Sequence, residues 1–508
     1  MTIIIQPKRI LIREFQDSSA LSRFIKMNTI TDLDMYFNIS KEWISLFETT
    51  WKGEPVVAIP RRFPLELLSN FVDISNDNIT RENNTIKGDT RLIKNPYDAK
   101  DEKQQEILNF LLGRGSFSGL AKKPRRALFT ETGSGKTFST LKSIAEENHF
   151  ACIVCPDEKA ILTWKQEIAK FTDIKPEEVM VLKGGDRLRT LIPKKNNYKI
   201  VLASSKTFSS LIIKGEFEYI EEFFNAMNFS LLVHDESHLN IIVLFFLEMM
   251  VATKRTYYLT ATPGRRIFKE AKLLMNLMPD EASTFMPPPE RRFDVRLCKY
   301  HSNPTHPDHV KGINKPRAMD YITYMKKIAL NPNLPYMEAY LSNLRKVLNS
   351  ARKNITKKGN KIAIVCKTKL ENEILYNALS DWTKKHNMSL GIFNSDIEDV
   401  DVRFEETNRD LIITTDRSFA GIINIVDLEA IVILNPITSE EHLKQIAGRI
   451  RKQPGKKSLL YIMADGSFKR AVAALTNAAA AMEDITLEAT RITLNPKEVI
   501  KVDISEID

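Results

Sequence analysis

The stretch "ALFTETGSGKTFSTL", residues 127 to 141, holds the side chains best suited to chemistry: Gly133, Ser134, Gly135, Lys136 and Thr137. A turn needs one glycine, whereas a loop that binds a triphosphate needs several backbone N–H groups unobstructed by a Cβ, a cation and a hydroxyl. Lys136 is expected to neutralise the β- and γ-phosphate oxygens of ATP, and the Thr137 hydroxyl to ligate Mg²⁺. The stretch therefore predicts a nucleotide site.

The sequence on either side of this loop supports the prediction. The apolar "RALF" predicts a strand and "FSTLKSIAEE" a helix, which is the context that a phosphate loop requires. Thr130 stands where the pattern usually has its first glycine, and Thr132 lies among the expected nucleotide contacts. A chance occurrence of these letters in an ordinary loop is the alternative.

A second apolar run, "SLLVHDESH", ends in two carboxylates, Asp235 and Glu236. The run predicts a strand, and ligands of open α/β sheets bind at the carboxyl ends of strands. Asp235 is expected to hold Mg²⁺, and Glu236 to polarise the attacking water. A solvated acidic turn is the alternative; the position downstream of the lysine, with Ser237 and His238 following, favours the catalytic interpretation.

Both stretches belong to a longer alternation of short apolar strands with amphipathic helices. The expected strands are "RALFT", "FACIVCP", "YKIVLAS", "FSLLVHDES" and "RTYYLTAT", followed by a second series of "NKIAIVCKT", "RDLIITTD", "AIVILNP" and "SLLYIMA". This alternation is typical of parallel sheets covered by helices on both faces. The fold class is therefore α/β, with two related layers.

Bulk composition sets the remaining bounds. A chain of 508 residues is too long for a single core, and its 43% hydrophobic and 27% charged content is typical of soluble globular proteins. No apolar run reaches the roughly 20 residues that span a bilayer, so no membrane partner is expected. The four cysteines, including Cys152 and Cys155, predict buried thiols in a reducing compartment, and hence a cytoplasmic location, that of the host cell if the chain is viral. The net charge of +10 favours a polyanionic partner.

The order of these motifs resembles that of superfamily 2 helicases. "TETGSGKT" resembles motif I and "DESH" is a variant of the DEAD/DEAH box. "LTATP" resembles motif III, which couples the nucleotide state to the grip on nucleic acid, here through Thr260 and Thr262. Gln104 in "KQQEIL" stands where the family often has an adenine-reading glutamine, and Gln105 competes for that role. The resemblance implies ATP and Mg²⁺ as cofactors.

Two further stretches resemble motifs that contact the sugar–phosphate backbone. "CIVCPDEKAILTWKQEIAKF" resembles motif Ia, with Pro156 at the expected strand end. "VLASSKTFSSL" is similar to the next such strand end, with Ser204, Ser205 and Thr207 as candidate phosphate donors. Contacts of this kind carry no sequence information, so the resemblance implies binding with little sequence preference.

The second series of strands carries the remaining motifs of the family. "IAIVCKT" resembles motif IV, and "ITTDRSFAGI" resembles motif V, with Thr415 expected at the nucleic acid and Gly421 at the nucleotide. "QIAGRIRKQPGKK" resembles motif VI, in which Gln445 should face the water and the γ-phosphate. Arg449 is the expected arginine finger. Arg451 lies one residue before the usual place of the second arginine, so either both or only Arg449 fills the role.

The resemblance implies two tandem RecA-like parallel-sheet domains with a small N-terminal α+β module and an insertion between the lobes. The expected segments are an N-terminal module at 1–95, a first RecA-like domain at 96–280, an insertion or linker at 281–360, a second RecA-like domain at 361–470 and a C-terminal tail at 471–508. The Asn-rich end of the N-terminal module predicts a linker or mobile loop. The sequence indicates no oligomeric state.

The implied function is an ATP-dependent nucleic-acid helicase or translocase. The motifs, with a tryptophan in motif Ia and "GRI" followed by "PGKK", are closer to those of double-strand DNA translocases, and the layout resembles the recombination helicases of large tailed phages, which remodel branched DNA. DNA is therefore favoured and RNA is possible. The alternatives are an RNA helicase or viral transcription factor of the same superfamily, and a nucleotide-gated binding protein that does not hydrolyse ATP.

Two segments outside the motor motifs contain further candidates. Trp51, Lys52, Arg61 and Arg62 could bind duplex DNA by stacking and phosphate contacts, or the tryptophan could be core and the basic residues solvated. The segment "HSNPTHPDH", residues 301 to 309, contains three histidines. Proline-broken loops seldom preorganise a metal site, so we expect a mobile insertion there that acts as a wedge or hook on branched DNA.

Overall fold

The computed structural model describes residues 3–502 apart from a set of gaps. The gaps are residues 7–8, 28, 35–38, 45–46, 62–64, 83–87, 132, 186–187, 189–196, 262–273, 275–276, 278–280, 316–318, 355–359, 398–401, 403–404, 421–424, 426, 435–436, 438, 451–457 and 496. The chain divides into two compact units, Met1–Pro287 and Pro288–Asp508, here called unit 1 and unit 2.

The centre of unit 1 is a seven-stranded sheet in which every described pairing is parallel. Its strand order is β10-β11-β9-β12-β13-β8-β14. The strands are β8 (Arg125–Phe129), β9 (Ala151–Cys155), β10 (Val179–Leu182), β11 (Ile200–Ser204), β12 (Leu231–Asp235), β13 (Arg255–Thr260) and β14 (Thr284–Phe285). All carboxyl ends therefore lie at one edge, where β8 and β12 are separated only by β13.

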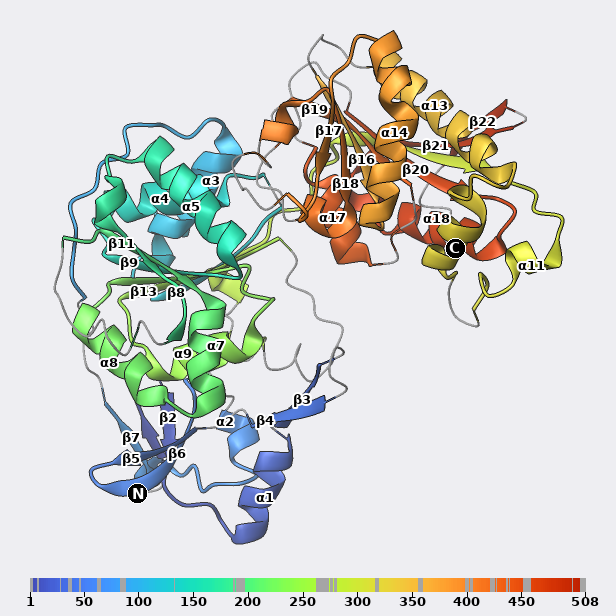
Figure 1. The fold of residues 1–508 in the computed structure, drawn as a ribbon. Helices are drawn as coiled ribbons and strands as arrows, with labels where there is room; N and C mark the ends of the chain where they lie inside the picture. Colours follow the sequence, from blue (N-terminus) through green and yellow to red (C-terminus); the bar gives the residue numbers. More distant parts are fainter. Residues whose placement is uncertain are drawn as a thin grey trace. The chain divides into compact units, whose positions relative to one another are not determined.

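Helices cover both faces of this sheet (Figure 1). One face carries α3 (Glu102–Leu112), α4 (Lys136–Glu146) and α5 (Glu158–Phe171). The other carries α7 (Ser205–Lys214), α8 (Phe217–Met227) and α9 (Ile241–Met250). Because both faces are buried, the strands are apolar runs without polar alternation, as the sequence predicted.

Helix α9, "IIVLFFLEMM", is apolar around its whole circumference because it is covered on two sides. It lies on the main sheet and also packs against β2 and β6 of the N-terminal module. Its one charged residue, Glu248, is buried and forms an ion pair with Arg125 at 2.8 Å. Burial opposes the Glu248 charge, but Arg125 and His234 outweigh it and lower the pKa of Glu248.

The N-terminal module is a five-stranded sheet of order β5-β6-β2-β1-β7 with a separate hairpin. Its elements are β1 (Ile3–Ile5), β2 (Arg9–Ile12), α1 (Ser18–Met27), β3 (Thr29–Asp34), β4 (Ile39–Ile44), β5 (Phe47–Trp51), β6 (Glu54–Pro60), α2 (Leu65–Leu68) and β7 (Ile79–Arg81). The expected α+β module is thus confirmed. An ion pair of 3.1 Å between Arg9 and Glu221 joins it to α8.

The sequence predicts a linker or mobile loop at the end of this module, and the described residues there are held by backbone hydrogen bonds. β7 pairs in parallel with β1. Further on, the Asp89 N–H donates to Asn228 O at 2.7 Å and the Arg91 N–H to Asn148 O at 2.8 Å. The polar composition is explained by these backbone bonds, which hold an extended segment on unit 1 without a large apolar contribution.

Unit 2 contains an eight-stranded sheet of order β17-β18-β16-β19-β20-β15-β21-β22, parallel except for its last pair. The strands are β15 (Phe293–Tyr300), β16 (Lys361–Cys366), β17 (Leu390–Phe393), β18 (Leu411–Thr415), β19 (Leu428–Ile433), β20 (Ser458–Asp465), β21 (Thr486–Leu494) and β22 (Lys497–Val502). The helices are α11 (Pro307–Val310), α12 (Tyr321–Tyr324), α13 (Tyr336–Asn354), α14 (Lys369–Lys385), α16 (Asp416–Ala420), α17 (Glu440–Ala447) and α18 (Lys469–Ala480).

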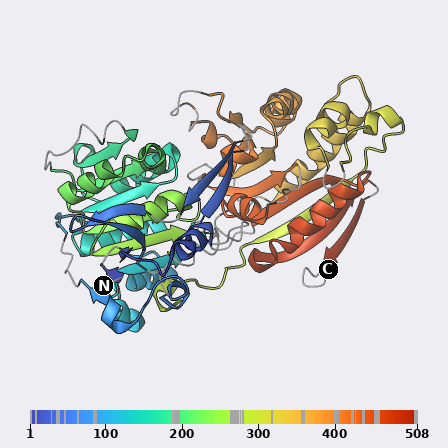
Figure 2. The ribbon, with the colours of Figure 1, turned by 90° about the horizontal axis from the view of Figure 1, so that it is seen from below.

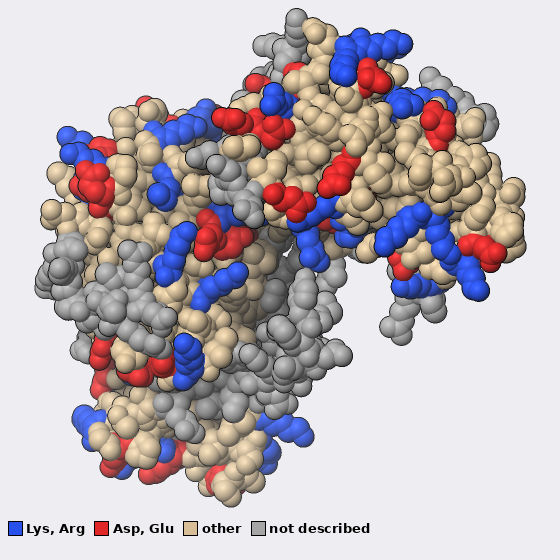
Figure 3. Space-filling model, viewed as in Figure 1, with Lys and Arg blue, Asp and Glu red and all other residues tan. Residues whose placement is uncertain are grey.

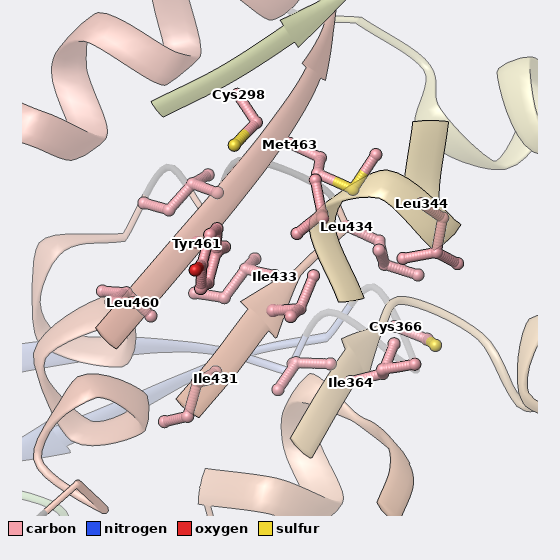
Figure 4. Close-up of a cluster of buried hydrophobic side chains, with 14 of the residues drawn as sticks. Cys298, Leu344, Ile364, Cys366, Ile431, Ile433, Leu434, Leu460, Tyr461 and Met463 are labelled. Atoms are coloured by element: carbon pink, nitrogen blue, oxygen red, sulfur yellow. The ribbon is translucent and has the colours of Figure 1, made fainter. Parts of the chain in front are cut away.

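The segment expected as an insertion supplies β14 to the unit 1 sheet and β15 to the unit 2 sheet, and the expected tail also belongs to the unit 2 sheet. β15 lies between β20 and β21, and the tail adds β21 and β22 together with α18, which packs against β20 and β15 (Figure 2). Side chains of β15, β16, β19 and β20 form one core with Leu344 of α13 (Figure 4). Unit 2 therefore begins near residue 288, well before the expected boundary at 361.

Candidate functional site

Three strand ends form the candidate nucleotide site in unit 1. The loop after β8 carries Lys136, β13 ends at Thr260, and β12 ends at Asp235. Neighbouring strands lie ~4.8 Å apart, so the ends of β8 and β12 are about 10 Å apart with β13 between them. The Thr130 N–H donates to Thr260 O at 3.1 Å, which fixes the start of the loop against the middle strand.

The phosphate loop is closed by its own side chains. Lys136 Nζ donates to Thr130 O at 2.6 Å and to Glu131 O at 3.1 Å. The hydroxyls of Thr130 and Ser134 are 2.8 Å apart. Gly133 and Gly135 have φ values of +83° and +94°, which other residues adopt only with strain. The lysine ammonium thus already lies against the loop backbone, where phosphate oxygens would exchange with the two carbonyls.

Gln104, and not Gln105, contacts this loop. A Cβ added to Gly135 would lie 2.2 Å from Gln104 Nε2, so the two residues are in close contact. Gln104 is 5% exposed, and its Oε1 accepts a hydrogen bond from the Lys100 N–H at 2.8 Å. Gln105 is exposed and donates to Asn109 Oδ1. The geometry therefore favours Gln104 for the nucleotide.

Asp235 has a hydrogen-bond donor, the Trp164 indole, that the sequence did not indicate. The indole Nε1 of Trp164, on α5, donates to Asp235 Oδ2 at 2.9 Å, and Trp164 is 1% exposed. Burial and the adjacent Glu236 charge raise the pKa of Asp235 to about 7, against the opposing effects of the Trp164 hydrogen bond and Lys136.

The oxygen donors present fit Mg²⁺. This cation prefers carboxylate and hydroxyl oxygens and is usually held by one or two protein groups together with substrate phosphates. Asp235 Oδ2 accepts the indole N–H, which leaves Oδ1 as a ligand atom. Thr137 lies in the first turn of α4, directly after Lys136. Asp235 and Thr137 are the residues that would hold the ion, which would neutralise charge on the phosphate oxygens.

Glu236 is tied to the end of β13. Thr260 Oγ1 lies 3.2 Å from Glu236 Oε2 and 2.7 Å from His238 Nδ1. We assign the Nδ1–H tautomer to His238, because Nδ1–H can then donate to Thr260 while the Thr260 hydroxyl donates to Glu236. Glu236 also has φ +46°, a conformation that costs a non-glycine residue about 1–2 kcal/mol. Thr260, expected as a coupling residue, thus contacts the expected catalytic carboxylate.

The hydroxyls expected to bind nucleic acid are used inside unit 1. Ser205 Oγ donates to Pro156 O at 2.9 Å, Thr207 Oγ1 donates to Leu182 O at 3.3 Å, and Ser204 Oγ accepts from the Lys206 N–H. All three hydroxyl residues are at most 4% exposed. The Ser205 and Thr207 hydroxyls thus link neighbouring segments at this edge, and the expectation that these side chains bind phosphates stays a prediction.

Ser204 and Thr207 line a shallow pocket at the same edge, together with residues that the sequence interpretation missed. These are Lys183, Gly184 and Gly185, which follow β10, and Lys206 on α7. The Gly184 N–H donates to Thr207 Oγ1 at 3.2 Å, so Thr207 shapes the glycine turn. The signal was present in "VLKGGD", where a lysine and two glycines follow an apolar strand.

In unit 2, Gln445 and Arg449 are both half-buried. Gln445 lies on α17 (Glu440–Ala447), and Arg449 follows the C-cap Gly448 in a turn in which its N–H donates to Ile446 O at 3.1 Å. Lys444 anchors the helix by an ion pair of 2.8 Å with Asp484. The remaining predicted residues Thr132, Thr262, Gly421 and Arg451 lie outside the described residues.

The end of β18 is also built from internal contacts. Thr415 is 7% exposed, and its hydroxyl donates to Ser418 Oγ at 3.0 Å. Next to it, Asp416 accepts from Lys367 Nζ at 2.6 Å and lies 3.8 Å from His442 Nε2 on α17. Burial opposes the Asp416 charge, but His442 and Lys367 outweigh it and lower its pKa. The ion cluster joins the ends of β16 and β18 to the helix that carries Gln445.

Some of the candidate DNA-binding residues in the N-terminal module make contacts within the module. Trp51 Nε1 donates to Glu82 Oε1 at 3.3 Å, and its ring packs on the inner cluster of the sheet. Lys52 lies over that ring, 4.4 Å from its centroid. Arg61 is half-buried, and Arg62 lies outside the described residues. These contacts favour a packing role for Trp51.

The histidine segment does not form a metal cluster among the residues that the structure describes. His309 Nδ1 lies 3.1 Å from the Tyr336 hydroxyl, and His306 lies 3.7 Å from Asp308. The four cysteines are free and buried. No helix within the described ranges is long and apolar enough to cross a membrane. On the face shown in Figure 3, basic and acidic side chains are interspersed among the described residues.

One protein-family model matches part of unit 1 in sequence. Residues 97–265 match the family described as "Type III restriction enzyme, res subunit". This match supports the superfamily 2 helicase resemblance for the unit that carries the phosphate loop and the DESH stretch. No curated protein matches the chain in sequence.

Solved structures with a similar fold include an "ATP-dependent Type ISP restriction-modification enzyme LlaBIII bound to DNA", with a TM-score of 0.50 and 14% identity over 79% of this chain. The match spans 32% of that longer protein. It supports the fold class of two tandem RecA-like domains.

Two further similar structures have lower scores. The S. cerevisiae structure "Dbp5 bound to RNA and ADP BeF3" has a TM-score of 0.48 and 15% identity, covering 77% of this chain and 89% of that one. The Pyrococcus furiosus Hef helicase domain has a TM-score of 0.42 and 14% identity, covering 73% and 96%.

Proposed function

We propose that this chain is an ATP-dependent nucleic-acid helicase or translocase that acts on duplex or branched DNA. The observation that carries the proposal is the set of side chains at one edge of the unit 1 sheet. Lys136 closes the phosphate loop, Asp235 offers a carboxylate oxygen, and Thr260 contacts Glu236. The pocket with Lys183 and Lys206 lies on the same edge.

In this proposal Lys136 neutralises the β- and γ-phosphates while Gly133 and Gly135 expose backbone N–H groups to them. Glu236 polarises the attacking water, and its position is set by Thr260. Mg²⁺, when bound by Asp235 and Thr137, supplies charge neutralisation at the phosphate oxygens. From the family resemblance we propose that Gln445 and Arg449 of unit 2 act on the same triphosphate, with Arg449 stabilising the charge that develops in the transition state.

We propose that movement requires one ATP to be contacted by residues of both units. ATP that contacts both units stabilises a closed arrangement, and hydrolysis removes that contribution. Backbone contacts at the strand ends then alternate between tight and weak binding. Because these contacts go to phosphates, sequence preference should be small. We propose DNA over RNA because the motif Ia tryptophan, Trp164, and the motif VI stretch are closer to those of double-strand DNA translocases. A branched DNA substrate would imply a role in repair or recombination.

The test compares ATP turnover of the wild-type chain and of Lys136→Ala with no nucleic acid, duplex DNA, forked DNA, Holliday-type DNA and RNA duplexes. The proposal predicts DNA-stimulated turnover in the wild type, strand separation on branched DNA, and loss of turnover in the variant with DNA binding retained. Undiminished turnover in Lys136→Ala would refute the site. Stimulation by RNA alone would refute the DNA assignment.

A further inference from the structure

Trp164 is the one side chain of α5 that makes a described hydrogen bond to a candidate catalytic group. Its indole N–H donates to Asp235 Oδ2 at 2.9 Å, and 1% of the residue is exposed. The ring also belongs to the core formed by α3, α4, α5 and the sheet. The indole therefore cannot turn away from Asp235 without repacking that core.

Helix α5 begins at the strand end that is expected to contact nucleic acid. β9 ends at Cys155, Pro156 follows, and Asp157 caps α5 by accepting from the Ala160 N–H at 2.9 Å. Pro156 O accepts from Ser205 Oγ, which joins this end to β11. Pro156 thus directly precedes the N-cap of the helix that carries Trp164.

The same strand end lies next to the catalytic carboxylates. One small pocket is lined by Cys155, Pro156, Asp235 and Glu236 among others. Asp235 and Pro156 therefore line the same pocket, and Trp164 of α5 is hydrogen-bonded to Asp235. An indole N–H has a fixed direction and accepts nothing, so it selects one orientation of the carboxylate.

We propose that Trp164 is a positioning residue that fixes the Asp235 carboxylate for Mg²⁺ and couples it to nucleic-acid contact at the start of α5. The inference rests on the proposed function and assigns a path for nucleic-acid stimulation. Hydrogen-bond partners of metal ligands change metal affinity about 10- to 100-fold when they are removed. The loss of the N–H should therefore weaken Mg²⁺-dependent nucleotide binding by about tenfold or more.

The experiment measures ADP affinity by calorimetry with and without Mg²⁺, and with and without duplex DNA, for the wild type and Trp164→Phe. Trp382→Phe is the matched control, because Trp382 is 8% exposed and its indole N–H makes no hydrogen bond in the described structure. A second variant has β-(3-benzothienyl)alanine at position 164, which keeps the ring shape and removes the N–H, so that a folding defect is separated from the loss of the hydrogen bond.

Both variants at position 164 should bind ADP normally without Mg²⁺, bind it about tenfold or more weakly with Mg²⁺, and lose the effect of DNA on that affinity. Mg²⁺ dependence equal to that of Trp382→Phe would overturn the inference. The failure of the proposed function is distinguishable, because the wild-type chain itself would then show no Mg²⁺-dependent ADP binding and no DNA-stimulated turnover.

Discussion

Gly135→Ala tests the contact between the phosphate loop and Gln104. The glycine has φ +94°, and a Cβ there would lie 2.2 Å from Gln104 Nε2. Since that distance is far below van der Waals contact, Gln104 must leave its position and lose the 2.8 Å hydrogen bond from the Lys100 N–H. The displacement should also weaken the preference for adenine over guanine nucleotides.

Two contributions determine how much Gly135→Ala lowers the free energy of unfolding. Left-handed backbone costs a residue with a Cβ about 1–2 kcal/mol. A lost buried hydrogen bond costs about 1 kcal/mol. The free energy of unfolding of unit 1 should therefore fall by about 2–3 kcal/mol in Gly135→Ala. Gly53 has φ +84° and no atom within 4 Å of its added Cβ, so Gly53→Ala should show the backbone term alone.

The assay is a double-mutant cycle by chemical denaturation. In a Gln104→Ala background the new methyl group has no side chain to displace, so Gly135→Ala should cost only the backbone term. The coupling between the two substitutions should be about 1 kcal/mol, above the deviation of about 0.5 kcal/mol seen for independent sites. Additive costs would contradict the reasoning, as would an equal cost for Gly53→Ala and Gly135→Ala with unchanged nucleotide preference.

Three further outcomes are expected. Burial raises the pKa of Glu371 to about 7, so ionisation of this carboxyl destabilises the native state as pH rises from about 4.5 to 7. In denaturation measured between pH 5 and 8, the free energy of unfolding of Glu371→Gln should exceed that of the wild type by up to about 3 kcal/mol. The exposed Glu373→Gln should show no such gain. Glu248→Ala leaves a buried arginine unpaired and should lower the free energy of unfolding by about 3–5 kcal/mol; a loss below 1 kcal/mol would contradict the burial argument. The double variant Lys183→Ala with Lys206→Ala should lower the slope of log binding constant against log salt concentration by about 2, which corresponds to about two lost phosphate contacts. An unchanged slope would contradict the role of this pocket in DNA binding.

The sequence predicted the grouping of those site residues that lie at the carboxyl ends of strands. Parallel strands bring their carboxyl ends to one edge, so Lys136, Asp235 and Thr260 could be grouped from motif order and the rule for open α/β sheets. Gln104 and Gln105 could not be separated, because both lie on α3 and only the packing of that helix decides which one contacts Gly135.

Partners that depend on tertiary packing were not predictable. Trp164 was recognised as part of motif Ia, but the atom that its indole meets is set by the approach of α5 to the sheet. The hydroxyl of Thr207 was assigned to phosphate because its residue type allows that contact, whereas burial directs it to Leu182 O. β15 was missed because "FDVRLCKY" has charged residues between prolines and a helix-like run, although its period-two alternation was visible.

The most direct measurement of the central claim is steady-state, DNA-stimulated ATP turnover of Glu236→Gln, Arg449→Ala and the double variant, with the exposed Arg352→Ala as control. If both residues act on one triphosphate, each single variant should lose about a thousandfold or more in kcat, and the double variant should be no slower than the slower single one within a few-fold. Wild-type kcat in Arg449→Ala, or losses that multiply in the double variant, would contradict the claim.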